Sequence, residues 1–222
     1  DSMDKEEIIE KVKREKIEFI DLMFSDLSGH LKSVTISPRE LKDCLDNGKW
    51  FDGSSVEGFT RIHESDMMLI PDLSTYIPLP WPRDEKKVSR IICDIYDPDN
   101  TPFTGDPRYV LKRVQEKAKK KGYFYYVGPE IEFFLFRSKE NRTYHDTAGY
   151  FDFSPRDMAT DIRAVMISTL EKLGINVEMT HHEVAPSQHE IDIEYSVALN
   201  AADKVMILKQ AIKTEANNRG LY

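Results

Sequence analysis

The chain has 222 residues, 40% of them hydrophobic and 32% charged, which is a typical composition for one or two globular domains. Its 31 basic and 39 acidic residues give a net charge of -8, which argues against a nucleic-acid or anionic-membrane partner. The apolar runs are too short to span a membrane, and the charged start from Asp4 onward resembles no signal peptide. Two cysteines are too few for a disulfide framework, so we expect a cytoplasmic protein.

The first part of the chain predicts a small sheet with a helix packed on it. Asp4 and Glu7 stand at the spacing of a capping box, which indicates a helix over residues 4–16. Ser37-Pro38 opens a second helix, which should end at Gly48. Strands are expected at 17–24, 31–36, 66–70 and 88–96, the first two as a hairpin. The linker-like run 97–102 places a domain boundary after residue 102.

A short acidic loop precedes the third of these strands. In residues 50–59, Asp52 and the small residues after it stand between aromatic side chains, which suggests a loop held at both ends by rings. A plain surface turn is the alternative, and the residues alone favour it. The proline-rich run 77–82 cannot be a central strand, because proline lacks a ladder donor.

The second part of the chain, residues 103–222, alternates helices and strands. The elements expected there are a helix from Asp106 to Gly122, a polar loop over 137–150, a helix from Ser154 to Gly174 and a strand over 175–179.

Residues 127–136 predict a buried strand, because an apolar and aromatic run follows the turn pair Gly128-Pro129. Side chains on a strand alternate between faces, so Glu130 and Glu132 project the same way, about 6–7 Å apart. Two carboxylates on one face of a core strand repel each other and lose hydration. A divalent cation such as Mg2+ or Mn2+ would offset both costs. The alternative is an edge strand with a solvated acidic face.

A second acidic cluster surrounds the turn signal Pro186-Ser187. A hairpin at this turn would bring Glu183 and Glu190 close together across two strands. Asp192 and Glu194 continue the alternation, and for these two we expect the solvated side of a half-buried strand. The nearby histidines lack the spacing of a helical zinc site, which disfavours a zinc hydrolase. Since no glycine-rich phosphate loop is present, any nucleotide must be held by metal and side chains.

Four segments together resemble type I glutamine synthetase, in the order that the family has. They are FDGSS (51–55), ESDM (64–67), GPEIEFFLF (128–136) and HHEVAPSQHE (181–190). The resemblance runs over nearly the whole chain, and four motifs are far more specific than one. Arg61 and the short loop 137–150 resemble the branch that is regulated by glutamine feedback.

The resemblance implies an α+β fold, with a β-grasp domain over 1–102 and the first part of a catalytic domain over 103–222. That catalytic domain opens as an antiparallel sheet with helices. The family makes glutamine from glutamate, ammonia and ATP through γ-glutamyl phosphate, and it uses two Mg2+ or Mn2+ ions. A homo-oligomer of stacked rings is also implied, because the loop that contains Asp52 serves the neighbouring subunit in this family.

Site residues follow from the same resemblance. The implied metal ligands are Glu132, Glu183 and Glu190 for one ion and Glu130 for the second. The implied ATP contacts are Glu178 and, against the adenine ring, Tyr195. Asp52 would bind ammonium and accept its proton, with Ser55 and Tyr150 near the same pocket. Phosphoryl transfer to a carboxylate gathers several negative charges, so divalent ions are needed to neutralise them.

Family members continue well past Tyr222. The missing portion carries the arginines for glutamate and phosphate and the last ligand of the second ion. We therefore expect an incomplete chain that has no synthetase activity alone. Two alternatives remain: a non-catalytic relative that keeps the fold for assembly, and a ligase that joins glutamate to another amine. The run that begins at Asp52 favours ammonia over another amine.

Overall fold

The computed structural model describes residues 3–54, 56 and 66–222. The chain forms two compact units, Asp1–Phe124 and Tyr125–Tyr222. Ser55 and Arg61 lie outside the described residues, so what was expected of them stays a prediction, as does the domain boundary after residue 102. Within the described ranges, no helix is both long and apolar enough to cross a membrane.

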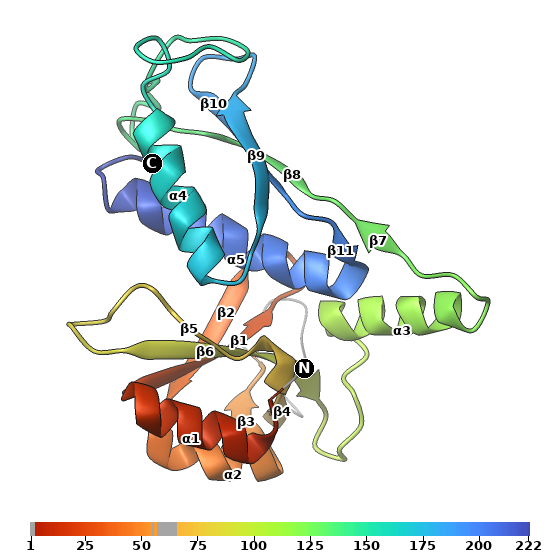
Figure 1. Ribbon diagram of the computed structural model, residues 1–222. Coiled ribbons are helices and arrows are strands. Elements are labelled where there is room, and N and C mark those ends of the chain that lie inside the picture. The colour runs from red at the N-terminus through yellow and green to blue at the C-terminus, as the bar shows by residue number, and fades with distance from the viewer. Residues whose placement is uncertain (1–2, 55, 57–65) are drawn as a thin grey trace. The chain divides into compact units, whose positions relative to one another are not determined.

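The first unit is built on a 6-stranded sheet with the order β2-β1-β6-β4-β3, in which β5 also pairs with β6 (Figure 1). Its strands are β1 (Phe19–Ser25), β2 (Leu31–Ile36), β3 (Lys49–Asp52), β4 (Asp66–Pro71), β5 (Ile77–Pro78) and β6 (Val88–Tyr96). The predicted hairpin of β1 and β2 is confirmed, and β1 runs parallel to β6. The proline-rich run contributes only the short strand β5, as expected.

Two helices, α1 (Lys5–Glu15) and α2 (Leu41–Asn47), pack on this sheet. The capping box of α1 is confirmed: the Asp4 carboxylate accepts from the Glu7 amide and the Glu7 carboxylate accepts from the Asp4 amide, both at 2.8 Å. A short 3-10 turn, Pro38–Glu40, precedes α2, and the helix ends before Gly48 as predicted.

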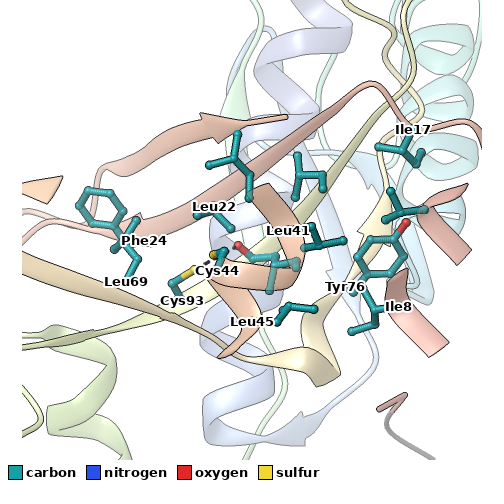
Figure 2. Packing of buried hydrophobic residues seen from close by; sticks show 14 of the residues in the cluster. Ile8, Ile17, Leu22, Phe24, Leu41, Cys44, Leu45, Leu69, Tyr76 and Cys93 are labelled. Carbon is teal, nitrogen blue, oxygen red and sulfur yellow. Dashed lines mark hydrogen bonds between the residues drawn. The ribbon is translucent and has the colours of Figure 1, made fainter. Parts of the chain in front are cut away.

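The core of the first unit lies between these helices and the sheet (Figure 2). Its buried side chains include Ile8, Ile17, Leu22, Phe24, Leu41, Cys44, Leu45, Leu69, Tyr76 and Cys93. Both cysteines are free thiols. Burial raises the pKa of Cys44 to about 11, so this thiol stays protonated and unreactive at neutral pH.

Helix α3 (Pro107–Lys119) also belongs to the first unit and is fixed by buried polar contacts. Asp106 caps it by accepting from the Arg108 amide at 2.9 Å. The Arg108 guanidinium, itself nearly buried, contacts Asp94 on β6 and Asp72, each at 2.6 Å. A buried arginine held by two carboxylates places α3 firmly against β6.

The second unit contains a 3-stranded antiparallel sheet with the order β8-β10-β9 and a small ribbon of β7 and β11 (Figure 1). Its elements are β7 (Tyr126–Val127), β8 (Glu130–Phe134), α4 (Thr160–Lys172), β9 (Val177–His182), β10 (Gln188–Ile193), β11 (Ser196–Val197) and α5 (Ala198–Asn217). The hairpin predicted around Pro186-Ser187 is confirmed as β9 and β10. The two helices pack on each other, and α4 also contacts β9.

Two predictions about the elements of this unit are wrong. Strand β8 is an edge strand of the described sheet and not a buried one: it pairs with β10 alone, and Glu130 and Glu132 are exposed. The helix expected from Ser154 begins at Thr160. The Asp157 carboxylate accepts from the Ala159 amide at 2.9 Å and pairs with Arg163, so it orders the chain just before α4, whereas Ser154 lies in the preceding turn.

Candidate metal centre

The register of three strands creates an acidic face on the second unit. Glu132 on β8 lies opposite Glu190 on β10, and Glu130 lies opposite Asp192. On the other side of β10, His181 of β9 also lies opposite Glu190. Because directly paired residues of antiparallel strands share a face, these carboxylates and this imidazole project to the same side of the sheet.

The closest group on this face is His181, Glu183 and Glu190, which offer ligand atoms within 4.8 Å of one another. The His181 ring lies 3.8 Å from the Glu183 carboxylate through Nδ1 and 3.5 Å from the Glu190 carboxylate through Nε2. The predicted proximity of Glu183 and Glu190 is thus confirmed. Burial, together with the nearby carboxyls of Glu183 and Asp192, raises the pKa of Glu190 to about 8. Negative charge crowded in this way favours a bound cation.

The two glutamates of β8 reach this face from the edge of the sheet. Gln188 Nε2 donates to the Glu132 carboxylate at 2.6 Å, which orients that side chain along β10. Both Glu130 and Glu132 are exposed, so the expected desolvation penalty is absent and the alternative of a solvated acidic edge describes their surroundings. Their position opposite Asp192 and Glu190 keeps them as candidate ligands.

Asp192 contradicts the prediction that it lies on a solvated side. Its exposed fraction is 7%, whereas Glu194 is exposed as expected and accepts from Asn176 Nδ2 at 2.8 Å. The β9–β10 register shifts directly after Asp192, so the regular alternation of β10 includes Glu190 and Asp192 but does not extend to Glu194. Asp192 therefore belongs with Glu190 on the acidic face.

A buried polar network fixes the turn between β9 and β10. One oxygen of the Asp146 carboxylate accepts from His182 Nε2 at 2.9 Å and from the Ser187 amide at 3.1 Å. The Ser187 hydroxyl accepts from the Asp146 amide at 2.8 Å and donates to the Asp146 carbonyl at 3.0 Å. Since Glu183 directly follows β9 in this turn, these bonds hold its backbone in place.

A second buried pair supports β10 from α4. Arg163 donates to Nδ1 of His189 at 2.9 Å and pairs with Asp157 at 2.7 Å. Burial, together with the charge of Arg163, lowers the pKa of His189 to about 3, so the ring is neutral. Asp146, His182 and His189 also lie close together, but the bond from Arg163 leaves the His189 proton on Nε2. That tautomer disfavours metal binding by this second group.

Aromatic rings pack against His181 in the candidate metal centre. Tyr150 and Phe151 stack at 3.9 Å between ring centroids, and both pack edge-on against His181, at 5.5 and 4.6 Å. The structure thus brings the predicted site residue Tyr150 next to the acidic cluster.

The remaining predicted site residues are Tyr195, Glu178 and Asp52. Tyr195 is 64% exposed and contacts Tyr126 edge-on at 6.0 Å. Glu178 is exposed on β9, where the register shifts. Asp52 ends β3 in the first unit and accepts from the Ser54 amide at 2.8 Å. The structure does not test the roles predicted for these three residues, so those roles stay predictions.

Two residues of the candidate site were not predicted from the sequence. The histidine spacing disfavours a zinc site and gives His181 no other role, although His181 stands two positions before Glu183 and opposite Glu190, a placement that the predicted hairpin already implies. Asp146 gave no local signal, because its partners His182 and Ser187 lie far along the chain.

The donors on this face suit a divalent cation. Carboxylate oxygens are the ligands that Mg2+ and Mn2+ prefer, and an imidazole is compatible with Mn2+. Asp192 Oδ1 is buried and has no hydrogen-bond partner in the part of the chain that the structure describes. A buried carboxylate oxygen without a partner is costly, and a nearby cation would relieve that cost.

Comparisons with known proteins match both parts of the chain to one family. The family model "Glutamine synthetase, catalytic domain" matches residues 104–222, and the model "Glutamine synthetase, beta-Grasp domain" matches residues 16–98. Among solved structures, a glutamine synthetase of Plasmodium falciparum aligns with a TM-score of 0.88 at 26% identity. The alignment covers 99% of this chain and 49% of the Plasmodium chain. A GmaS/ADP complex aligns with a TM-score of 0.87 at 28% identity, covering 96% and 50%.

Curated relatives are closer in sequence. The glutamine synthetase of Clostridium saccharobutylicum is 48% identical over 98% of this chain and 50% of the relative. That of Thermotoga maritima is 47% identical over 96% of this chain and 51% of the relative. The chain therefore spans about half the length of the relatives it matches. With a β-grasp match followed by a catalytic-domain match, the chain belongs to the glutamine synthetase family.

Proposed function

We propose that this chain is the N-terminal portion of a glutamine synthetase, whose full length joins ammonia to L-glutamate at the expense of ATP, through γ-glutamyl phosphate. The observation that carries the proposal is the convergence of Glu183, Glu190 and His181 within 4.8 Å, inside the segment that the catalytic-domain model matches. A protein kept only for assembly has no need of acids gathered against a histidine in this way.

The candidate ligands divide between two sites. Glu183 and Glu190 would hold one Mg2+ or Mn2+ together with Glu132, which Gln188 orients. Glu130, two residues from Glu132 on β8, would contribute to a second ion. When bound, such ions supply charge neutralisation for the phosphates of ATP and of the acyl phosphate.

The other proposed roles concern the substrates. Glu178 and Tyr195 would contact ATP, with the exposed Tyr195 ring available to stack on adenine. Asp52, with Ser55 and Tyr150, would hold ammonium, and the Asp52 carboxylate would accept its proton so that neutral ammonia attacks. For the full-length protein we propose a cytoplasmic oligomer of stacked rings.

Calorimetric titration with Mn2+ tests the proposal on the 222-residue chain. The wild type should bind Mn2+, and Glu183→Gln and Glu190→Gln should each weaken binding at least about tenfold, because each removes a charged ligand. Glu10→Gln, a change on the exposed side of α1 in the first unit, is the matched control and should leave binding unchanged. Absence of binding by the wild type would favour a non-catalytic relative.

Turnover is expected to need more than this chain. Because it spans about half of its relatives, we expect no glutamine formation from glutamate, ammonia and ATP by the purified 222-residue protein. Glutamine production above a protein-free blank, measured by chromatography, would contradict this expectation.

A further inference from the structure

The feature that the proposed ligand set leaves unexplained is the buried carboxylate of Asp192. This residue is 7% exposed, and its Oδ1 has no hydrogen-bond partner among the described residues. Buried carboxylates in proteins are normally paired with a cation or with several donors, because a desolvated charge is costly. An unpartnered oxygen at this position indicates that a ligand completes its environment.

The position of Asp192 shows where that ligand would lie. It stands two residues from Glu190 on β10 and opposite Glu130 on β8, so it occupies the acidic face between candidate ligands of the two ions. Its carboxyl is close enough to Glu190 to interact with that carboxyl directly. On its other side, the paired residue of β9 is Met179, whose thioether is only a weak acceptor and cannot donate a hydrogen bond.

We propose that Asp192 is a further residue of the cation site and holds the ion with Glu183 and Glu190, either directly or through a coordinated water. The inference rests on the proposed function, since it requires that the acidic face bind a divalent ion. It adds a residue that the family resemblance did not assign. The alternative is a structural aspartate whose carboxylate makes no contribution to ion binding.

Glu194 provides a matched control for this idea. It lies two residues further along the chain and carries the same charge, but its side chain is exposed and bonded to Asn176. A general loss of negative charge near the site would affect binding similarly in Asp192→Asn and Glu194→Gln. A role in holding the ion affects only the first.

The test is Mn2+ calorimetry on the 222-residue chain, with thermal unfolding in EDTA as a second readout. Asp192→Asn should weaken Mn2+ binding about tenfold or more, the range seen for residues that contact or orient metal ligands. Asp192→Glu, which keeps the charge, should recover part of that loss, and Glu194→Gln should bind like the wild type. In EDTA, Asp192→Asn should unfold at the same or a higher temperature, since it removes a buried carboxylate that faces another; a structural role predicts a lower one.

The outcomes separate the two ideas. If Glu190→Gln loses Mn2+ binding while Asp192→Asn binds like the wild type, the role of Asp192 is overturned and the proposed function stands. If the wild type does not bind Mn2+, both are overturned. Should circular dichroism show that Asp192→Asn is unfolded, Asp192→Ser, which is smaller than the space it enters, supplies the same comparison.

Discussion

Gly48 shows how a residue without a side chain can determine the backbone conformation at the end of a helix. It follows α2 with φ 77° and ψ 178°, a conformation that L side chains rarely adopt. A Cβ there would lie 2.7 Å from Ile70 Cδ1 and 3.1 Å from the Leu69 carbonyl oxygen. Gly48→Ala should therefore lower the free energy of unfolding by about 2–4 kcal/mol, combining backbone strain with overpacking.

Gly29 separates these two causes. It also has positive φ (78°), but a Cβ there would meet nothing within 4 Å. Gly29→Ala should cost only the backbone term, about 1 kcal/mol, in the same urea unfolding measurement. Equal losses for the two variants would show that packing around Gly48 contributes nothing.

Asp106 makes the stability of the first unit depend on pH. Burial raises the pKa of this carboxyl to about 6, from an ordinary 3.8, although the Ile95 and Arg108 amides partly oppose the shift. The folded state thus holds the proton more tightly than the unfolded state. The contribution of the protonated carboxyl to the free energy of unfolding is therefore complete below about pH 4 and is lost as the pH rises through 6. The loss should reach about 2–3 kcal/mol, at about 1.4 kcal/mol per pKa unit.

Asp106→Asn isolates this effect because the other carboxylates are common to both proteins. Urea unfolding between pH 4 and 7.5 should show the wild type losing stability relative to the variant over the lower part of that range, with a constant difference above about pH 7. Parallel stability curves over the whole range would contradict the assignment.

Individual residues also show how far the sequence could predict the site. The proximity of Glu183 and Glu190 followed from the turn signal and period-two alternation, and both held in the structure. The burial of Asp192 could not be foreseen, because β10 is the central strand of its sheet and is buried along nearly its whole length, whereas alternating acids indicate a half-buried strand.

Among the elements, the turn between β9 and β10 is the one that positions Glu183 in the candidate metal centre. Ser187 has a positive φ of 59° and makes two hydrogen bonds to the Asp146 backbone through its hydroxyl. Ser187→Ala removes both bonds and keeps the backbone strain, so it should lower the free energy of unfolding by about 1–3 kcal/mol. Ser187→Gly removes the same bonds but relieves about 1 kcal/mol of strain, so it should be less destabilised.

Both variants should also bind Mn2+ several-fold more weakly, because the Glu183 backbone loses part of its support. Urea unfolding and calorimetry measure the two effects on the same samples. If Ser187→Gly proves less stable than Ser187→Ala, or if Mn2+ affinity is unchanged in both, the turn does not act through these bonds.

Element boundaries show where prediction from the sequence stopped. The starts of α1 and α3 were predicted from local capping signals, and the structure has both caps. The start of α4 was not, because Asp157 is held by Arg163 one turn into the helix and by the Ala159 amide. The edge position of β8 could not be predicted either, because an apolar run has the same sequence pattern in a central strand and in an edge strand.

At the scale of the whole molecule, all the candidate ligands of the first ion belong to one unit. Glu132, Glu183 and Glu190 lie in Tyr125–Tyr222, whereas the core cluster of α1, α2 and their sheet lies in Asp1–Phe124. A ligand that binds only the folded state stabilises it by about 2.7 kcal/mol at a hundred times its dissociation constant. That stabilisation should appear in the unit that contains the metal-binding residues.

Hydrogen exchange with and without Mn2+ measures this distribution. Saturating Mn2+ should slow exchange of the β8, β9 and β10 amides by up to about a hundredfold, which is the equivalent of 2.7 kcal/mol, and should change β1 and β6 far less. Glu183→Gln should abolish the difference in β9 and β10, which ties the effect to the acidic face. Equal protection of both units would mean that they unfold as one cooperative body, and protection confined to β1 and β6 would place the ion outside the proposed site.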